Sequence, residues 1–278
     1  MRVAVNGVRL FVDVAGPKLR PDGPWLREVP TVVIVHTGPG ADHTPYKAHI
    51  GPVLAERAEV LYVDLRGHGR SEASTPETWR VATWTDDLHA LLERLHVSQP
   101  VLLGAGWGSL VALHYAHRWP DEVSKLVLVN PAARLVLPRM VARFDELGGA
   151  AIGDVARMFY DNPDERTVAL YMRECFPVIV GGSYVMPALL DPIWNLSLAV
   201  EWTREEARTL DLTPELPSIT APSLVVAGTD DPQYPTASIE EVVDTLPNVR
   251  AHWYPGARHS VFRDAPESMQ VVKDFVTP

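Results

Sequence analysis

Short runs of apolar residues recur along both flanks of the chain and predict the strands of a sheet. Alternating runs at residues 2–6 and 9–14 flank an Asn-Gly pair, which predicts a hairpin. The runs at residues 31–36, 59–64 and 100–104 are mainly apolar throughout, as in strands that are buried on both faces. Three further strands are predicted at residues 123–130, 223–228 and 249–256.

The segments between these strands favour helices. From Thr78 to His96, apolar residues recur at three- and four-residue spacings, which predicts an amphipathic helix. Helices also fit Ser238 to Thr245 and Pro266 to Phe275. This alternation of strands and helices predicts a mostly parallel sheet that is covered on both faces. Residues 16–25, rich in Pro and Gly, are expected to form only a connection.

One long segment lacks any strand pattern and is expected to be an inserted helical lid. We predict a division of the chain into a core at residues 1–132, a lid at 133–216 and a second core part at 217–278. Methionine-rich surfaces adapt their shape, so this lid would suit an apolar substrate; alternatively, its large apolar residues form the lid's own core. These residues are Met140, Met158, Met172, Met186, Trp194 and Trp202.

Composition narrows the classes of partner. The net charge of −10 disfavours nucleic acid and anionic membrane surfaces, both of which need a basic face. Cys175 is the single cysteine, so no intramolecular disulfide forms, and a reducing compartment is expected. Neither a signal-peptide pattern nor an apolar run of about 20 residues is present. We therefore expect a cytoplasmic protein that acts on a small molecule.

Unusual loops follow several of the predicted parallel strands. In such sheets, ligands bind beyond the carboxyl ends of the strands. The glycines of HTGPG would let backbone N–H groups approach a ligand closely, as an oxyanion hole requires. The loops are HTGPG at 36–40, DLRGHGRS at 64–71, GAGWG at 104–108, GTDDPQYP at 228–235 and GARHSVF at 256–262.

These loops resemble the motifs of the α/β-hydrolase superfamily, in particular its proline-iminopeptidase branch. That branch carries HGGPG, GGSWGS, DxRGxGRS, GxxDPxxP and GxxHxxF, and the similar stretches of this chain occur in the same order. The resemblance implies an α/β-hydrolase fold with a mostly parallel central sheet, an N-terminal hairpin and an inserted helical lid.

The resemblance also implies roles for individual residues. Asp231 would be the acid, in preference to its neighbour Asp230, and His259 the base. The backbone N–H groups of Gly38 and Trp107 would form the oxyanion hole. The position of the nucleophilic serine is occupied by Gly106, so the covalent serine mechanism is absent from this sequence.

Gly106 leaves three interpretations open. In the first, the native protein is a serine hydrolase whose serine was replaced to disarm it. In the second, glycine is natural, and His259 with Asp231 acts as a general base for water attack, cyclisation or a lyase reaction. In the third, the protein is a non-catalytic relative that binds a ligand. A preserved acid–base pair argues against the third interpretation.

Four other side chains are candidates for a replacement nucleophile. Ser109 lies one helical turn beyond the elbow, Ser260 is expected to point away from the pocket, and Cys175 fits a core position. Thr37 stands where the resembling motif has a glycine in the oxyanion loop, and it is the candidate expected to reach the pocket.

The expected substrate is a small, fairly apolar ester, lactone or amide, with Thr37, Trp194 and Trp202 as candidate contacts. An aminopeptidase would also need carboxylates that hold a free amine. Glu201, Glu205 and Glu206 are the candidates, although such a run more commonly forms a solvated helix face. Metal-binding and phosphate-binding motifs are absent from the sequence, so no cofactor is expected.

Overall fold

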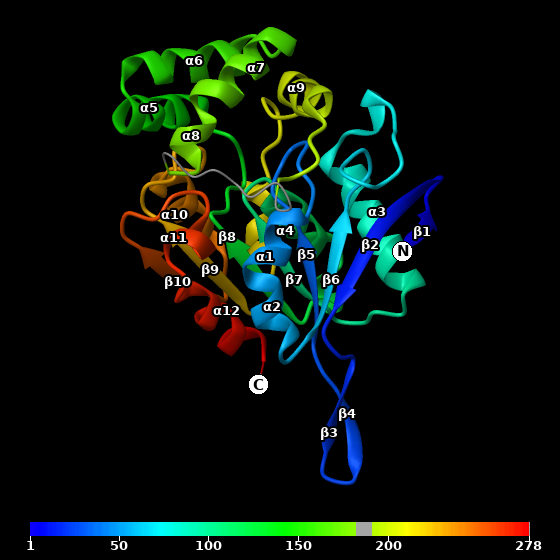
Figure 1. The fold of residues 1–278 in the computed structure, drawn as a ribbon. Coiled ribbons are helices and arrows are strands. Elements are labelled where there is room, and N and C mark those ends of the chain that lie inside the picture. Colours follow the sequence, from blue (N-terminus) through cyan, green and yellow to red (C-terminus); the bar gives the residue numbers. More distant parts are fainter. Residues whose placement is uncertain (182–190, 278) are drawn as a thin grey trace.

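The computed structural model describes residues 1–181 and 191–277. Its central sheet has eight strands in the order β1-β2-β6-β5-β7-β8-β9-β10 (Figure 1). The pairings β1–β2 and β2–β6 are antiparallel, and the strands from β6 through β10 pair in parallel. The strands are β1 (Arg2–Val5), β2 (Val8–Ala15), β5 (Thr31–Val35), β6 (Glu59–Asp64), β7 (Val101–Ala105), β8 (Lys125–Val129), β9 (Ser223–Gly228) and β10 (Val249–Tyr254).

Successive residues of the central strands enter two different hydrophobic clusters, because side chains alternate across a sheet. Val33 and Val35 of β5 face one cluster, with the helices α3, α4 and α10. Val32 and Ile34 face the other, with α2, α11 and α12. The continuous apolar runs are explained by this burial on both faces. These helices are α2 (Ile50–Ala55), α3 (Val81–Arg94), α4 (Gly108–Arg118), α10 (Thr236–Thr245), α11 (Val261–Asp264) and α12 (Ser268–Val276).

A second, two-stranded sheet stands where only a connection was expected. Strands β3 (Leu19–Asp22) and β4 (Trp25–Glu28) pair around a two-residue loop, and Gly23 has the left-handed φ of +61° that suits such a tight turn. The prediction was wrong because LRPD and WLRE lack the apolar alternation of a half-buried strand. The hairpin extends away from the main sheet in Figure 1.

In the described part of the chain between β8 and β9, five α-helices form a group that we call the cap helices, at one end of the sheet (Figure 1). They have a hydrophobic cluster of their own, which includes Phe144, Phe159 and Tyr171. The cap helices are α5 (Leu137–Gly148), α6 (Ala150–Asp161), α7 (Glu165–Glu174), α8 (Phe176–Ile179) and α9 (Leu196–Glu205). The division of the chain at residues 133 and 216 stays a prediction.

The remaining helices within residues 1–181 and 191–277 are short. They are α1 (Thr44–Ala48) and the 3₁₀ turns η1 (Pro76–Thr78), η2 (Pro120–Glu122) and η4 (Thr213–Ser218). In the described ranges, no helix has both the length and the apolar character that crossing a membrane requires.

Candidate active site

Gly106 forms a sharp turn between β7 and α4. Its φ of +52° lies in the left-handed region, which glycine enters without strain. Its N–H donates to the carbonyl of Val129 at the end of β8 (2.8 Å). A Cβ atom built at position 106 would lie 2.7 and 2.8 Å from Cε1 and Nε2 of His259, and 2.8 Å from Oγ1 of Thr37. Any side chain at this position therefore requires His259 and Thr37 to shift.

His259 and Asp231 come together from the loops that follow β10 and β9. Nδ1 of His259 lies 2.7 Å from Oδ2 of Asp231, whose side chain is fully buried. The other carboxylate oxygen accepts hydrogen bonds from the backbone N–H groups of Gln233 (2.8 Å) and Tyr234 (3.2 Å). A carboxylate is only an acceptor, so the proton of a neutral His259 is on Nδ1 and the lone pair of Nε2 faces the cavity.

Asp230, the rival acid, belongs to a different interaction. Its carboxylate accepts a hydrogen bond from Nη2 of Arg143 on α5 (2.9 Å) and lies in an ion pair with that side chain. Asp231 is thus the aspartate that contacts His259.

The backbone around His259 is fixed by Asn130, which the sequence analysis did not single out. Its side-chain amide donates to the carbonyl oxygens of Arg258 (3.2 Å) and His259 (3.1 Å), and its Oδ1 accepts from the N–H of Gly228 (2.8 Å). Asn130 directly follows β8 and has a φ of +45°, a conformation that asparagine tolerates better than most residues. The sequence could have indicated Asn130, because it directly follows a predicted parallel strand, at the sheet edge where functional residues gather.

The residues of the two predicted oxyanion donors are in contact, since Gly38 lies against the indole ring of Trp107. A Cβ atom at Gly38 would approach Cε3 of the Trp107 indole to 3.0 Å, so a larger residue would push against the ring. Neither the Gly38 nor the Trp107 backbone N–H donates to another residue in the described part of the chain. An oxyanion hole needs such unpaired N–H groups, and the assignment of these two residues to it stays a prediction.

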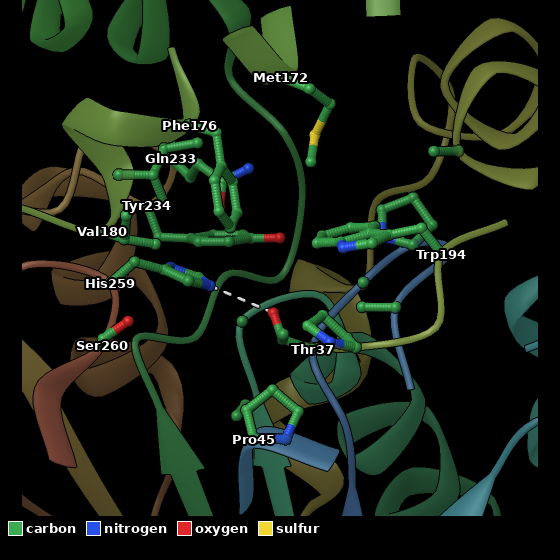
Figure 2. A pocket seen from close by; sticks show the side chains of 18 of the residues that line it. Thr37, Pro45, Met172, Phe176, Val180, Trp194, Gln233, Tyr234, His259 and Ser260 are labelled. Atoms are coloured by element: carbon green, nitrogen blue, oxygen red, sulfur yellow. Dashed lines mark hydrogen bonds between the residues drawn. The ribbon is translucent and has the colours of Figure 1, made fainter. Parts of the chain in front are cut away.

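Thr37 directly precedes Gly38 in the loop and contacts the histidine. Its Oγ1 is 3.1 Å from Nε2 of His259, as the dashed line in Figure 2 shows. Its backbone N–H donates to the hydroxyl of Tyr46 (3.2 Å), and its carbonyl bonds with Nδ1 of His36 (2.7 Å). Burial lowers the pKa of His36, which keeps its ring neutral and suited to this structural role.

A family model described as alpha/beta hydrolase fold matches residues 30–266. The chain belongs to this family. It is 26% identical to a proline iminopeptidase of Levilactobacillus brevis, over 86% of the chain and 85% of that relative. It is 30% identical to a monoacylglycerol lipase of Mycolicibacterium smegmatis, over 98% and 93%. The crystal structure of a Mycobacterium smegmatis proline iminopeptidase superposes with a TM-score of 0.71 at 21% identity, over 99% of this chain and 97% of that one.

These comparisons confirm the predicted fold with its mostly parallel central sheet. The named sequence relatives are hydrolases, which supports a hydrolase-type enzyme.

The α/β-hydrolase site opens into a cavity of about 170 Å³ between the strand-end loops and the cap helices. Met140 and Met172 of the predicted lid line it, whereas Met158 is 45% exposed. Met186 lies outside the described residues. Trp194 and Trp202 both line the cavity as well, and Figure 2 shows Trp194 across from Tyr234.

Several cavity residues were missed by the sequence analysis. Tyr234 stacks on His259 with ring centroids 5.6 Å apart, and Tyr46 anchors the loop that carries Thr37. Phe176 contacts the edge of Trp194 at 5.7 Å between centroids. Tyr234 lies in the loop at 228–235, three residues after Asp231. The sequence therefore indicated this loop, but not that the Tyr234 ring faces the cavity.

The alternative nucleophiles differ in their access to the cavity. Ser260 lines it, so the expectation that this side chain points away was wrong. The residue directly precedes α11, but its side chain makes no capping hydrogen bond to that helix. Ser109 is buried, and its hydroxyl donates to the carbonyl of Gly106 (2.6 Å). Cys175 is also buried, and burial raises the pKa of its thiol to about 12, which makes it a poor nucleophile.

None of the three candidate glutamates lines the cavity. Glu206 accepts hydrogen bonds from the Val81 N–H (2.8 Å) and the indole of Trp202 (2.7 Å), and burial raises its pKa. Glu201 pairs with Arg204 on the same helix, and Glu205 with Arg80. Among the residues that the structure describes, no three His, Cys, Asp or Glu side chains are grouped so that they could hold a metal ion.

Proposed function

We propose that this α/β hydrolase cleaves a small apolar ester, lactone or amide, with His259 and Asp231 as its general base. The observation that carries the proposal is the 2.7 Å bond between Nδ1 of His259 and Asp231, which leaves Nε2 facing an apolar cavity. A non-catalytic binding protein has no need for this arrangement. A blocked cavity, or a histidine beyond the reach of Asp231, would have favoured that interpretation.

Each group has a defined part in the reaction. Asp231 holds the imidazole in the tautomer whose Nε2 accepts a proton, and it stabilises the imidazolium that forms. His259 removes a proton from the attacking oxygen and later returns it to the leaving group. The N–H groups of Gly38 and Trp107 stabilise the negative charge that develops on the carbonyl oxygen, a contribution of about 3–4 kcal/mol for one such donor.

The lining of the cavity supports a substrate without a free amine. The relative from Levilactobacillus brevis is named for iminopeptidase activity, which requires an anchor for an amino group. In the described part of this chain, however, the cavity lining contains no aspartate or glutamate, and its cationic side chain is Arg263. Apolar acyl groups instead meet Met172, Phe176 and Trp194. We therefore favour neutral esters and lactones over aminoacyl amides.

A second candidate is a serine hydrolase that has been disarmed at Gly106. The turn at this residue, with its φ of +52° and the free N–H of Trp107, matches what a nucleophile elbow requires. Against this candidate, Thr37 and His259 close on the space that a side chain at position 106 would need.

The test is the hydrolysis of p-nitrophenyl esters, lactones and aminoacyl amides of graded size by the unaltered protein with Gly106. We expect turnover of short esters, with His259→Ala and Asp231→Asn each lowering kcat by at least about 10³-fold. An absence of turnover with every substrate would overturn the proposal, as would full activity in the His259→Ala protein.

A further inference from the structure

We propose that the Thr37 hydroxyl is the nucleophile of this site and that His259 activates it. The inference rests on the proposed function and names the oxygen that attacks the substrate. In the related motifs a serine occupies the elbow and a glycine follows the histidine of the oxyanion loop. This chain has Gly106 at the first position and Thr37 at the second. Compared with those motifs, the hydroxyl is carried by the oxyanion loop instead of the elbow.

The position of the Thr37 oxygen supports this exchange. Oγ1 lies 3.1 Å from Nε2 of His259 and 2.8 Å from the point where a Cβ at residue 106 would be. It therefore lies beside the space from which an elbow serine would project. The absence of a side chain at Gly106 is what gives the threonine this room. Thr37 also lines the cavity, so its oxygen is open to a substrate (Figure 2).

The proton arrangement favours activation of Thr37. Because Asp231 accepts the proton of Nδ1, Nε2 has one lone pair, and the hydroxyl of Thr37 is its hydrogen-bond partner. The three residues thus form a continuous hydrogen-bonded chain: the carboxylate of Asp231 orients the base His259, and His259 bonds to the hydroxyl of Thr37. This is the general signature of an activated nucleophile.

The backbone of Thr37 is held on both sides. Its N–H donates to Tyr46, and its carbonyl bonds to the buried ring of His36. Tyr46 itself is almost fully buried. A nucleophile that is fixed in this way loses little freedom when the substrate binds, which lowers the entropic part of the barrier.

The reaction then proceeds in two balanced steps. Oγ1 of Thr37 bonds to the carbonyl carbon while its proton passes to Nε2 of His259 and the carbonyl electrons move onto oxygen. The bond to the leaving alcohol breaks, and the alcohol takes the proton from His259, which leaves an acyl-threonine ester. Water attacks this ester, gives its proton to His259 and releases the acid, and Thr37 recovers its proton.

The test uses two variants that separate the hydroxyl from the shape of the side chain. Thr37→Val keeps the shape and removes the oxygen, whereas Thr37→Ser keeps the oxygen. With p-nitrophenyl butyrate, we expect Thr37→Val to lower kcat by at least about 10³-fold and Thr37→Ser to remain within about tenfold of the wild type. Thermal unfolding checks that both variants are folded.

The covalent step has its own readout. The wild-type protein is quenched in acid during turnover or treated with a fluorophosphonate, and the modified peptide is mapped by mass spectrometry. We expect an adduct on Thr37 that is missing from Thr37→Val and His259→Ala. An adduct on any other residue, or an active Thr37→Val protein, overturns the assignment. Loss of activity in His259→Ala, together with an active Thr37→Val, would reject this inference and leave the proposed function standing.

Discussion

At the scale of single residues, positions 37 and 106 complement each other. Glycine at 106 accepts a left-handed φ of +52° without strain. Because it has no side chain, it also leaves an open space, which is bordered by the Thr37 side chain and the His259 ring. A threonine in the oxyanion loop would crowd a serine at the elbow, so the two departures from the family motif depend on each other.

Behind the candidate site, His68 couples stability to pH. Burial lowers the pKa of His68 to about 3, with a further contribution from His36. Its Nδ1 bonds to the carbonyl of Arg66 (3.0 Å), while Nε2 is buried without an acceptor among the described residues. Protonation of Nε2 would place an unpaired charge beside Trp84 and Trp107, which pack on this ring.

The free energy of unfolding should therefore fall in acid. The unfolded chain takes up a proton at His68 near pH 6.5, whereas the folded protein does so only near pH 3. Between these values the unfolded state binds more protons, so stability decreases as the pH is lowered, by up to about 1.4 kcal/mol per pH unit from this group. Urea unfolding at pH 6.5 and 4.5 should show a smaller loss of stability for His68→Phe than for the wild type, by up to about 2.3 kcal/mol. Equal losses in the two proteins would contradict this account.

At the scale of secondary-structure elements, the strands were predicted well because their burial leaves a direct pattern in the sequence. The helix predicted from Thr78 begins three residues later, at Val81, after a short 3₁₀ turn. The β3–β4 hairpin was missed because its strands are mostly exposed. The direction of each cap-helix side chain was also hidden, since helix rotation is decided by packing: Met172 meets the cavity and Met158 faces solvent.

The cap helices and the segment before α9 should set the range of acyl groups. Trp194 lines the cavity opposite the His259 loop, so Trp194→Ala enlarges the space available to a substrate. We expect the ratio of kcat/KM for p-nitrophenyl octanoate to that for the butyrate to rise at least about fivefold, since one methylene in an apolar pocket contributes about 1 kcal/mol or more. Trp25→Ala is the matched control, because Trp25 is 76% exposed on the β3–β4 hairpin. An unchanged ratio in Trp194→Ala would show that other residues limit the acyl chain.

At the scale of the whole molecule, the sequence predicted the α/β-hydrolase fold and the pairing of Asp231 with His259, residues 28 positions apart. The contact between Thr37 and His259 was not predicted. It joins residues 222 positions apart and depends on how closely two loops approach at the end of the sheet. The wrong expectation for Ser260 has the same cause: a side-chain direction in a loop is set by packing and leaves no periodic signal.

The most direct test of a site that works without an elbow serine compares the wild type with Gly106→Ser and Gly106→Ala. We predict that the wild-type protein hydrolyses p-nitrophenyl butyrate and that both variants are slower. A Cβ at this position displaces His259 and Thr37, and the left-handed backbone adds strain of about 1–3 kcal/mol. An increase in kcat by several orders of magnitude in Gly106→Ser, but not in Gly106→Ala, would contradict the account and identify a disarmed serine hydrolase.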